Sequence, residues 1–254
     1  MVIKPLKSKK FYDKESLKGF NAMDVENLTL PNHDGLQLPV VISLCGPSIS
    51  KLFIIESNRL DCAIKKGDVN LIDHLVTGLW LDFFYYLENN PLPDTIFAHN
   101  LGGFDGLFLY KALLKSRDKD NVKAIIDNKN KFISITYQTP CGIKYVWKDS
   151  YRVFPISLSD LCETFGVDGK IGEYKDEYND ISVFSKDNSL KNFLDYALQD
   201  AKALYEALHK AQNIYYDQYH VDVTTIFSTS TLSLKIFRQG FLKTDIPIMS
   251  RSED

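Results

Sequence analysis

The sequence lacks the features of disulfide-stapled, cysteine-ligated metal-binding, membrane-spanning and secreted proteins. Its four cysteines form no CxxC pair and no Cys/His ligand spacing, so we expect free thiols in a reducing compartment. No apolar run approaches the length of a membrane span, which predicts a protein without a membrane segment. The basic start, MVIKPLKSKKF, lacks an apolar signal core, and this argues against secretion. The sequence therefore predicts an intracellular protein.

Excess positive charge is also absent. The formal net charge is −3 at pH 7, whereas a protein that grips a long duplex usually carries a basic face. Any contact with nucleic acid is therefore expected to be short and local. The length of 254 residues suits one large domain, or one domain plus a fragment, and suffices to bury a core.

Hydrophobic patterning predicts strands first, then alternating helices and strands. Residues 18–27, 38–45 and 51–55 read as strands of an antiparallel meander. The later elements are a helix at 70–87, a strand at 95–100, a helix at about 105–114, strands at 131–137 and 143–148, a short helix ended by Gly166, a polar loop at 167–188 and a helix at 190–210. This order indicates a mixed α/β sheet with helices on its faces.

The first chemical motif is Asp24-Val25-Glu26. Strand alternation places Asp24 and Glu26 on one face and Met23 and Val25 on the other. Two carboxylates held this close repel each other unless a cation lies between them. Mg²⁺ is bound in this way, by a few carboxylates together with water and phosphate. A solvated strand face has the same pattern, so this motif alone does not distinguish a metal site from an exposed surface.

The second motif, Asn100-Leu-Gly-Gly-Phe-Asp105, lies where a strand enters a helix. Gly102 and Gly103 would let the backbone approach a substrate closely. Asn100 can hydrogen-bond a nucleotide, Phe104 can stack on a base, and Asp105 can reach a metal ion. The alternative is that Asp105 only caps the helix, which is a common role of aspartate.

The third motif places Tyr196 and Asp200 one helical turn apart, on the same face of the helix predicted at 190–210. Asp200 lies at the edge of the apolar stripe, near Phe193, whereas Asp195 and Gln199 lie on the polar side. A carboxylate at the rim of a buried face needs a partner, and a metal ion would be one. The alternative is a boundary residue that leans into solvent.

Taken together, DxE on a strand, NxxxFD at a strand-to-helix junction and YxxxD in a helix resemble the exonuclease motifs of the family B DNA polymerases. They match the tyrosine version of the four-carboxylate exonucleases. The segments NLGGFDGLFLYKALL and WKDSYRVFPISLSDLCETFGV are similar to the protein-primed branch of phage, adenoviral and linear-plasmid replicases, mitochondrial plasmids included. The resemblance implies a ribonuclease H-like α/β fold, with a mixed sheet flanked by helices, and a proofreading 3′→5′ exonuclease.

The resemblance also implies a mechanism with two Mg²⁺ or Mn²⁺ ions, about 3.5–4 Å apart. Asp24 would bridge both ions. Glu26 and Asp200 would hold the ion that generates hydroxide, and Asp105 would hold the other mainly through water. Tyr196 would orient the attacking water, and the product would be a 5′-mononucleotide.

Two further elements of the branch carry over. A D-S-L element that contacts the single strand reads Asp149-Ser150-Tyr151 here, so Ser150 is retained and Tyr151 replaces the leucine. A catalytic lysine that touches the scissile phosphate matches Lys170, followed by a tyrosine that matches Tyr174. This segment is one residue shorter than the pattern, and Lys175 is the alternative lysine.

The implied partner is the unstacked 3′ end of single-stranded DNA, gripped by sequence-tolerant aromatic stacking. The residues expected to bind it are Asn100, Phe104, Ser150, Tyr151 and Tyr174. The resemblance also implies a terminal priming protein as a partner of the polymerase part. It implies a location in the mitochondrion, or in the cytoplasm, as in a phage host cell.

Past about Val221 the sequence changes to a Ser/Thr-rich stretch with a short amphipathic helix, similar to the segment that links the exonuclease and polymerase parts. We therefore expect residues 1–220 to be the exonuclease domain and 221–254 the truncated start of the polymerase domain. Two alternatives stay open. One is an RNA-trimming exonuclease with the same carboxylates, and the other is an inactive relic that binds nucleic acid.

Overall fold

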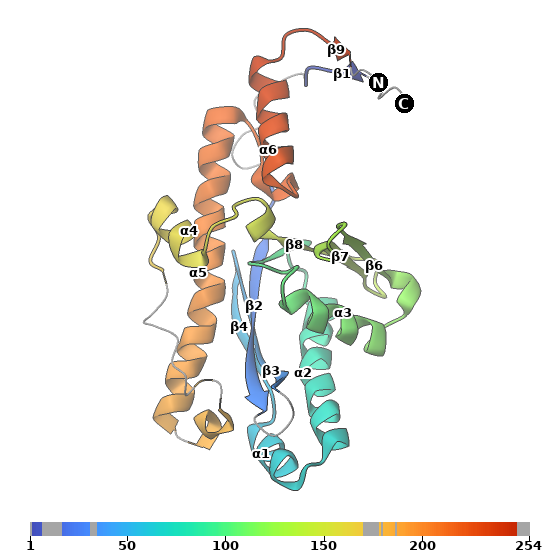
Figure 1. Ribbon diagram of the computed structural model, residues 1–254, viewed down its shortest axis with the longest axis vertical. Coiled ribbons are helices and arrows are strands. Elements are labelled where there is room, and N and C mark those ends of the chain that lie inside the picture. Colours follow the sequence, from blue (N-terminus) through green and yellow to red (C-terminus); the bar gives the residue numbers. More distant parts are fainter. Residues whose placement is uncertain are drawn as a thin grey trace.

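A seven-stranded mixed sheet forms the centre of the molecule (Figure 1). The computed structural model describes residues 2–6, 17–30, 35–169, 178, 180–185 and 187–247. The strand order is β4-β3-β2-β5-β8-β7-β6, in which β2, β5 and β8 are parallel and the other neighbours antiparallel. The strands are β2 (Asn21–Leu30), β3 (Leu36–Gly46), β4 (Ile49–Ile54), β5 (Thr95–Ala98), β6 (Val122–Ile126), β7 (Phe132–Gln138) and β8 (Lys144–Asp149).

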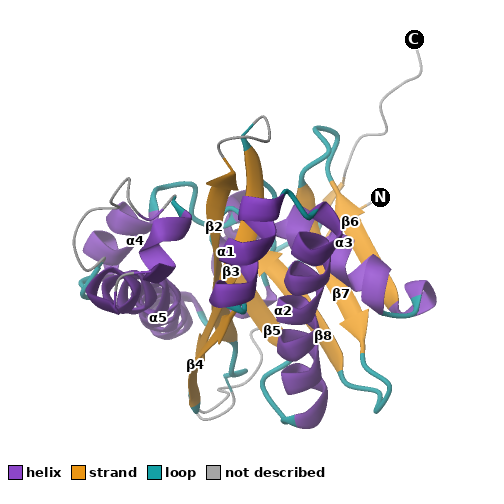
Figure 2. Cartoon of the chain, turned by 90° about the horizontal axis from the view of Figure 1, so that it is seen from below, coloured by secondary structure: helices purple, strands orange, loops and turns teal. Residues whose placement is uncertain are grey.

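Helices cover both faces of this sheet (Figure 2). The long helix α5 (Asp187–Tyr219) lies over β2, β3 and β4 on one face, with α4 (Leu158–Phe165) beside it. Helices α2 (Val69–Asn89) and α3 (Asp105–Ser116) cover the other face, and α1 (Ser57–Lys66) packs against α2. The predicted α/β fold, a mixed sheet flanked by helices, is confirmed.

Shorter elements connect and extend this frame. They are the single-turn helices η2 (Lys119–Asn121), η3 (Ser150–Arg152), η5 (Ile181–Ser185) and η6 (Val223–Thr225), then α6 (Thr229–Ile236), the π-helical turn η7 (Phe237–Phe241), and the strands β1 (Val2–Ile3) and β9 (Ile246–Pro247). The last two form an antiparallel pair, which brings the two ends of the described chain together (Figure 1). None of the helices in the described part of the chain combines the length and apolar character that a bilayer crossing requires.

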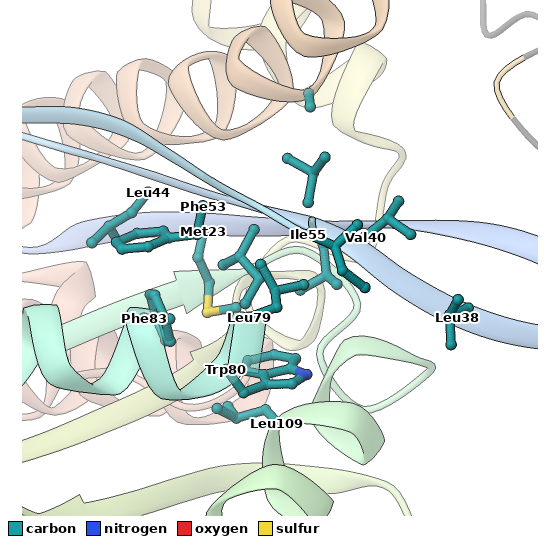
Figure 3. Close-up of a cluster of buried hydrophobic side chains, with 14 of the residues drawn as sticks. Met23, Leu38, Val40, Leu44, Phe53, Ile55, Leu79, Trp80, Phe83 and Leu109 are labelled. Carbon is teal, nitrogen blue, oxygen red and sulfur yellow. The ribbon is translucent and has the colours of Figure 1, made fainter. Parts of the chain in front are cut away.

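The main core lies between the sheet and α2 (Figure 3). Met23 and Val25 on β2 are buried in it, and Trp80 and Phe83 of α2 pack against the same side of the sheet. Because side chains alternate along a strand, burying Met23 and Val25 turns their acidic neighbours on β2 toward the opposite face. That face is the one covered by α5.

The elements differ from the prediction where tertiary packing outweighs the local pattern. Helix α5 begins three residues earlier and ends nine residues later than the predicted 190–210, because apolar residues such as Leu208 and Ala211 continue the buried stripe into a second core. Helix α1 and strand β6 were not predicted. Strand β6 pairs only with β7 and exposes most of its side chains, so it carries no strong alternation.

The second core joins residues on both sides of position 220. Phe97 at the end of β5 and Leu208 on α5 share it with Val221, Ile226 and Leu232, all of which are buried. The start of the C-terminal segment therefore packs directly on the sheet and on α5. The division into residues 1–220 and 221–254 stays a prediction about domains.

A buried lysine on β8 contacts the segment that follows α5. Its contacts lead us to expect an effect of pH on stability. Lys148 on β8 donates to the carbonyl oxygen of Thr224 (2.5 Å), and its Nζ lies 4.3 Å from the centre of the Phe227 ring. Burial lowers the pKa of Lys148 to about 8 from its usual 10.5. Between these two values the folded state binds fewer protons than the unfolded state, so the contribution of Lys148 to stability rises with pH.

The measurement is the thermal midpoint of the wild type minus that of Lys148→Met, which removes the titrating group. We expect this difference in thermal midpoint to increase as the pH is raised from 8 toward 10. A difference that stays constant over this range would contradict the prediction.

Candidate metal centre

Three carboxylates from two distant segments meet between β2 and α5. Asp24 and Glu26 project from the face of β2 that α5 covers, and Asp200 projects from α5. One ligand oxygen from each residue lies within 4.8 Å of the other two. The structure thus brings together the first and third sequence motifs.

The donor set fits a hard divalent cation. Three carboxylates at this spacing repel each other strongly unless positive charge lies among them. Mg²⁺ binds oxygen ligands at about 2.0–2.1 Å, which places ligands on opposite sides of one ion about 4.2 Å apart. The observed spacing is therefore compatible with a shared ion after a small contraction, and both Mg²⁺ and Mn²⁺ prefer such oxygen donors.

Asp105 is the fourth of the predicted acidic residues. It is the first residue of α3 and is only 7% exposed. Burial raises the pKa of Asp105 well above its usual value, and the negative charges of Asp24 and Asp149 raise it further. The charge of Asp24 therefore reaches Asp105, which is not itself one of the three carboxylates whose oxygens lie within 4.8 Å of one another. A cation at the site would oppose these effects and favour the ionised form of Asp105.

The loop that presents Asp105 is tightly folded. Asn100 adopts a left-handed conformation with φ 66°. A Cβ on Gly103 would lie 2.5 Å from the side-chain amide of Asn100, and one on Gly102 would lie 3.0 Å from the carbonyl oxygen of Phe132. A side chain at position 102 would thus press on the backbone of Phe132, whereas one at position 103 would meet only the side chain of Asn100. That the two glycines let a substrate approach the backbone stays a prediction.

Aromatic side chains near the acidic site fall into two groups. Tyr196 lies on α5 one turn before Asp200; it is buried, with its ring centre 5.8 Å from that of Tyr178. Phe104 and Tyr151, by contrast, are 38% and 42% exposed. The two exposed rings are available for stacking, whereas Tyr196 lies in the interior, one helical turn before Asp200.

Ser150 was expected to bind the DNA strand, but its side chain does not reach the surface. It is fully buried, and its hydroxyl is 2.9 Å from His99 Nδ1 and 3.2 Å from the carbonyl oxygen of Ala98. The reason is that η3 begins directly after β8 and turns the side chain back toward the neighbouring strand β5. Ser150 therefore contributes to the structure of the site rather than to an open surface.

Sequence reasoning missed the structural part of His99, and it named Asp149 only as the first residue of the D-S-L element. Both stand at the carboxyl ends of strands, β5 and β8, which are parallel neighbours with Ala98 opposite Asp149. Polar residues at the ends of adjacent parallel strands meet at one edge of a sheet, so the strand order would have identified them. Lys170, Tyr174 and Lys175 lie outside the described residues.

Comparison with known proteins identifies the family. Residues 87–176 and 168–254 match the model of DNA polymerase type B, organellar and viral. The chain belongs to the organellar and viral type B DNA polymerases. The resemblance found in the sequence is thereby confirmed.

The relatives of this type B polymerase chain are longer. A probable DNA polymerase of Agaricus bitorquis is 24% identical over 203 residues, an alignment that covers 67% of this chain and 25% of the relative. The fold is similar to Phi29 DNA polymerase complexed with primer-template DNA and incoming nucleotide (TM-score 0.57, 15% identity, 87% of this chain and 34% of that one). It is also similar to Phi29 DNA polymerase complexed with single-stranded DNA (TM-score 0.55, 15% identity, covering 86% of this chain and 34% of that one). The chain thus spans about a third of that polymerase and a quarter of the fungal relative.

Proposed function

We propose that this part of the type B polymerase is a 3′→5′ exonuclease that removes nucleotides from the 3′ end of single-stranded DNA during replication. The observation that carries the proposal is the group formed by Asp24, Glu26 and Asp200, and the charge of Asp24 also acts on the buried Asp105. Carboxylates gathered in this way suit hard cations, and cation centres of this kind are used for phosphate chemistry.

In this function Asp24, Glu26 and Asp200 would hold Mg²⁺ or Mn²⁺, and Asp105 would hold a second ion. Bound ions would supply a water of lowered pKa and would stabilise the leaving 3′ oxygen. The buried Tyr196 hydroxyl would orient the water, since the ring is fixed one turn before Asp200 on the same helix.

The surface near the acidic site suits a short, unpaired strand end. The exposed rings of Phe104 and Tyr151 offer stacking surfaces for any base, and Asn100 offers an amide for hydrogen bonding. The net charge of −3 fits a contact of a few nucleotides better than a grip on a long duplex. The fold similarity to a polymerase complexed with single-stranded DNA supports the same substrate.

The test is incubation of the full chain with 5′-labelled single-stranded DNA and Mg²⁺ or Mn²⁺, with EDTA as the control. A ladder of shortened labelled products is expected with either metal and none with EDTA. RNA of the same sequence is expected to be shortened more slowly. Faster shortening of RNA would favour an RNA-trimming enzyme, and no shortening under any divalent metal would overturn the catalytic proposal.

Removing the Tyr196 hydroxyl is expected to slow the reaction without abolishing it. Tyr196→Phe keeps the buried ring but loses the group that orients the water, so we expect a decrease of roughly 10- to 100-fold in the single-turnover rate. Tyr205→Phe is a matched control, because it removes a hydroxyl from the same helix at a ring that packs on Phe20. Equal rates for wild type and Tyr196→Phe would exclude this role.

A further inference from the structure

We infer that Asp149 is a positioning residue of the metal centre, because its carboxylate fixes the loop that presents Asp105. The inference rests on the proposed function only in taking the acidic site as a cation site. Asp149 is the last residue of β8 and is buried, with 5% of its surface exposed. It is not one of the three carboxylates whose oxygens lie together.

The carboxylate of Asp149 joins two loops that leave the same edge of the sheet. One oxygen accepts the backbone N–H of Asn100 (2.9 Å) and that of Tyr151 (3.0 Å), and the other accepts the backbone N–H of Gly102 (3.1 Å). Two of these donors belong to the loop between β5 and α3. The third belongs to the turn after β8. Both oxygens are therefore engaged in holding backbone.

This loop needs external support because its conformation is strained. Asn100 has φ 66°, a left-handed conformation that costs a non-glycine residue free energy and persists only where the surroundings impose it. The Asn100 N–H bond to Asp149 is one such constraint, and hydrogen bonds to an ionised acceptor are stronger than neutral ones. Asp105 begins α3 only five residues later, so a shift of the loop would move its carboxylate.

A second contact couples the same two loops. His99 Nε2 donates to the carbonyl oxygen of Ile156 (2.9 Å), and His99 Nδ1 lies 2.9 Å from the Ser150 hydroxyl. This pair links the end of β5 to the segment after β8, next to Asp149. Ser150→Ala would therefore loosen the same junction without touching the carboxylate.

Asp149→Asn is the informative substitution, since it keeps shape but not acceptor capacity. An amide has one acceptor oxygen, and its NH₂ group would face a backbone N–H that Asp149 now accepts. We expect the affinity for Mn²⁺, measured by electron paramagnetic resonance of free Mn²⁺ in titrations of the full chain, to fall about 10-fold or more. In the same titration, Ser150→Ala should weaken the affinity for Mn²⁺ by about threefold or more.

Asp222→Asn is the matched control. Asp222 also holds a turn, accepting from the N–H of Thr224 (2.9 Å) and from Gln212 Nε2 (3.0 Å). Gln212 lies twelve residues beyond Asp200 on α5, roughly 18 Å along the helix. We expect the Mn²⁺ affinity of Asp222→Asn to equal that of the wild type.

The outcomes are distinct. A folded Asp149→Asn that binds Mn²⁺ like the wild type would overturn the inference. If that variant does not fold, as judged by circular dichroism, Ser150→Ala decides, and unchanged affinity there would overturn it as well. A wild type that binds Mn²⁺ more tightly than the variants but shortens no DNA would leave the inference standing and refute the proposed exonuclease. A wild type that binds no Mn²⁺ would refute both.

Discussion

Asp24→Ala and Asp200→Ala are each expected to reduce metal-dependent shortening of single-stranded DNA by about a thousandfold or more. The two residues contribute from β2 and α5 to the same group of oxygens, so losing either leaves an incomplete cation site. Metal ions contribute several kcal/mol to such reactions, and about 4 kcal/mol corresponds to roughly a thousandfold in rate. The measurement is the single-turnover rate on 5′-labelled DNA at saturating Mn²⁺.

Asp195→Ala is the control for these two variants. Asp195 lies on α5 like Asp200 but is exposed to solvent, so its loss changes the charge of the helix without changing the acidic site. We expect activity close to that of the wild type. If Asp195→Ala and Asp200→Ala were equally active, the three carboxylates would not form the catalytic centre.

The largest effect on stability is expected for Trp80→Ala, at about 3–5 kcal/mol. Trp80 is 1% exposed and lies in the core between α2 and the sheet (Figure 3). Its ring centre is 6.0 Å from that of Phe83 and 5.8 Å from that of Phe84. Truncation removes these contacts and leaves a cavity that the surrounding helix and sheet fill only in part. Urea unfolding of the two proteins measures the difference.

Trp80→Phe separates packing from hydrogen bonding. The buried indole N–H of Trp80 has no hydrogen-bond partner among the described residues, so removing it breaks no hydrogen bond. We expect Trp80→Phe to cost less than about 1.5 kcal/mol, because most of the apolar volume is kept. A cost equal to that of Trp80→Ala would show that the ring packing is not what stabilises this core.

Much of the metal centre could be anticipated because its parts are locally encoded. Strand alternation places Asp24 and Glu26 on one face whatever the partner is, and helical periodicity places Tyr196 on the same face as Asp200. The strand-to-helix junction before Asp105 follows from a short apolar strand and its glycines. Helix α1 escaped prediction because it has only ten residues and few apolar ones, although Leu60 and Ala63 share its buried face. Strand β6 escaped because most of its side chains are exposed.

The inward turn of Ser150 could not be anticipated from its neighbours in sequence. Its hydroxyl is oriented by His99 and Ala98, which lie 51 and 52 residues away in the chain, because β5 and β8 are adjacent in the sheet. The same adjacency gives Asp149 two of its three backbone donors, the N–H groups of Asn100 and Gly102. A linear motif records which residues are present but not which strand lies next to them.

By itself, then, the sequence determined the family, the α/β class and the faces on which the acidic side chains project, since each depends on local periodicity or on a motif with fixed spacing. Only the tertiary structure decided that β2 and α5 lie close enough to bring three carboxylates within 4.8 Å, and that Asp149 holds the loop before Asp105. Both depend on contacts between segments far apart in the chain, whose geometry is set by packing of the whole sheet.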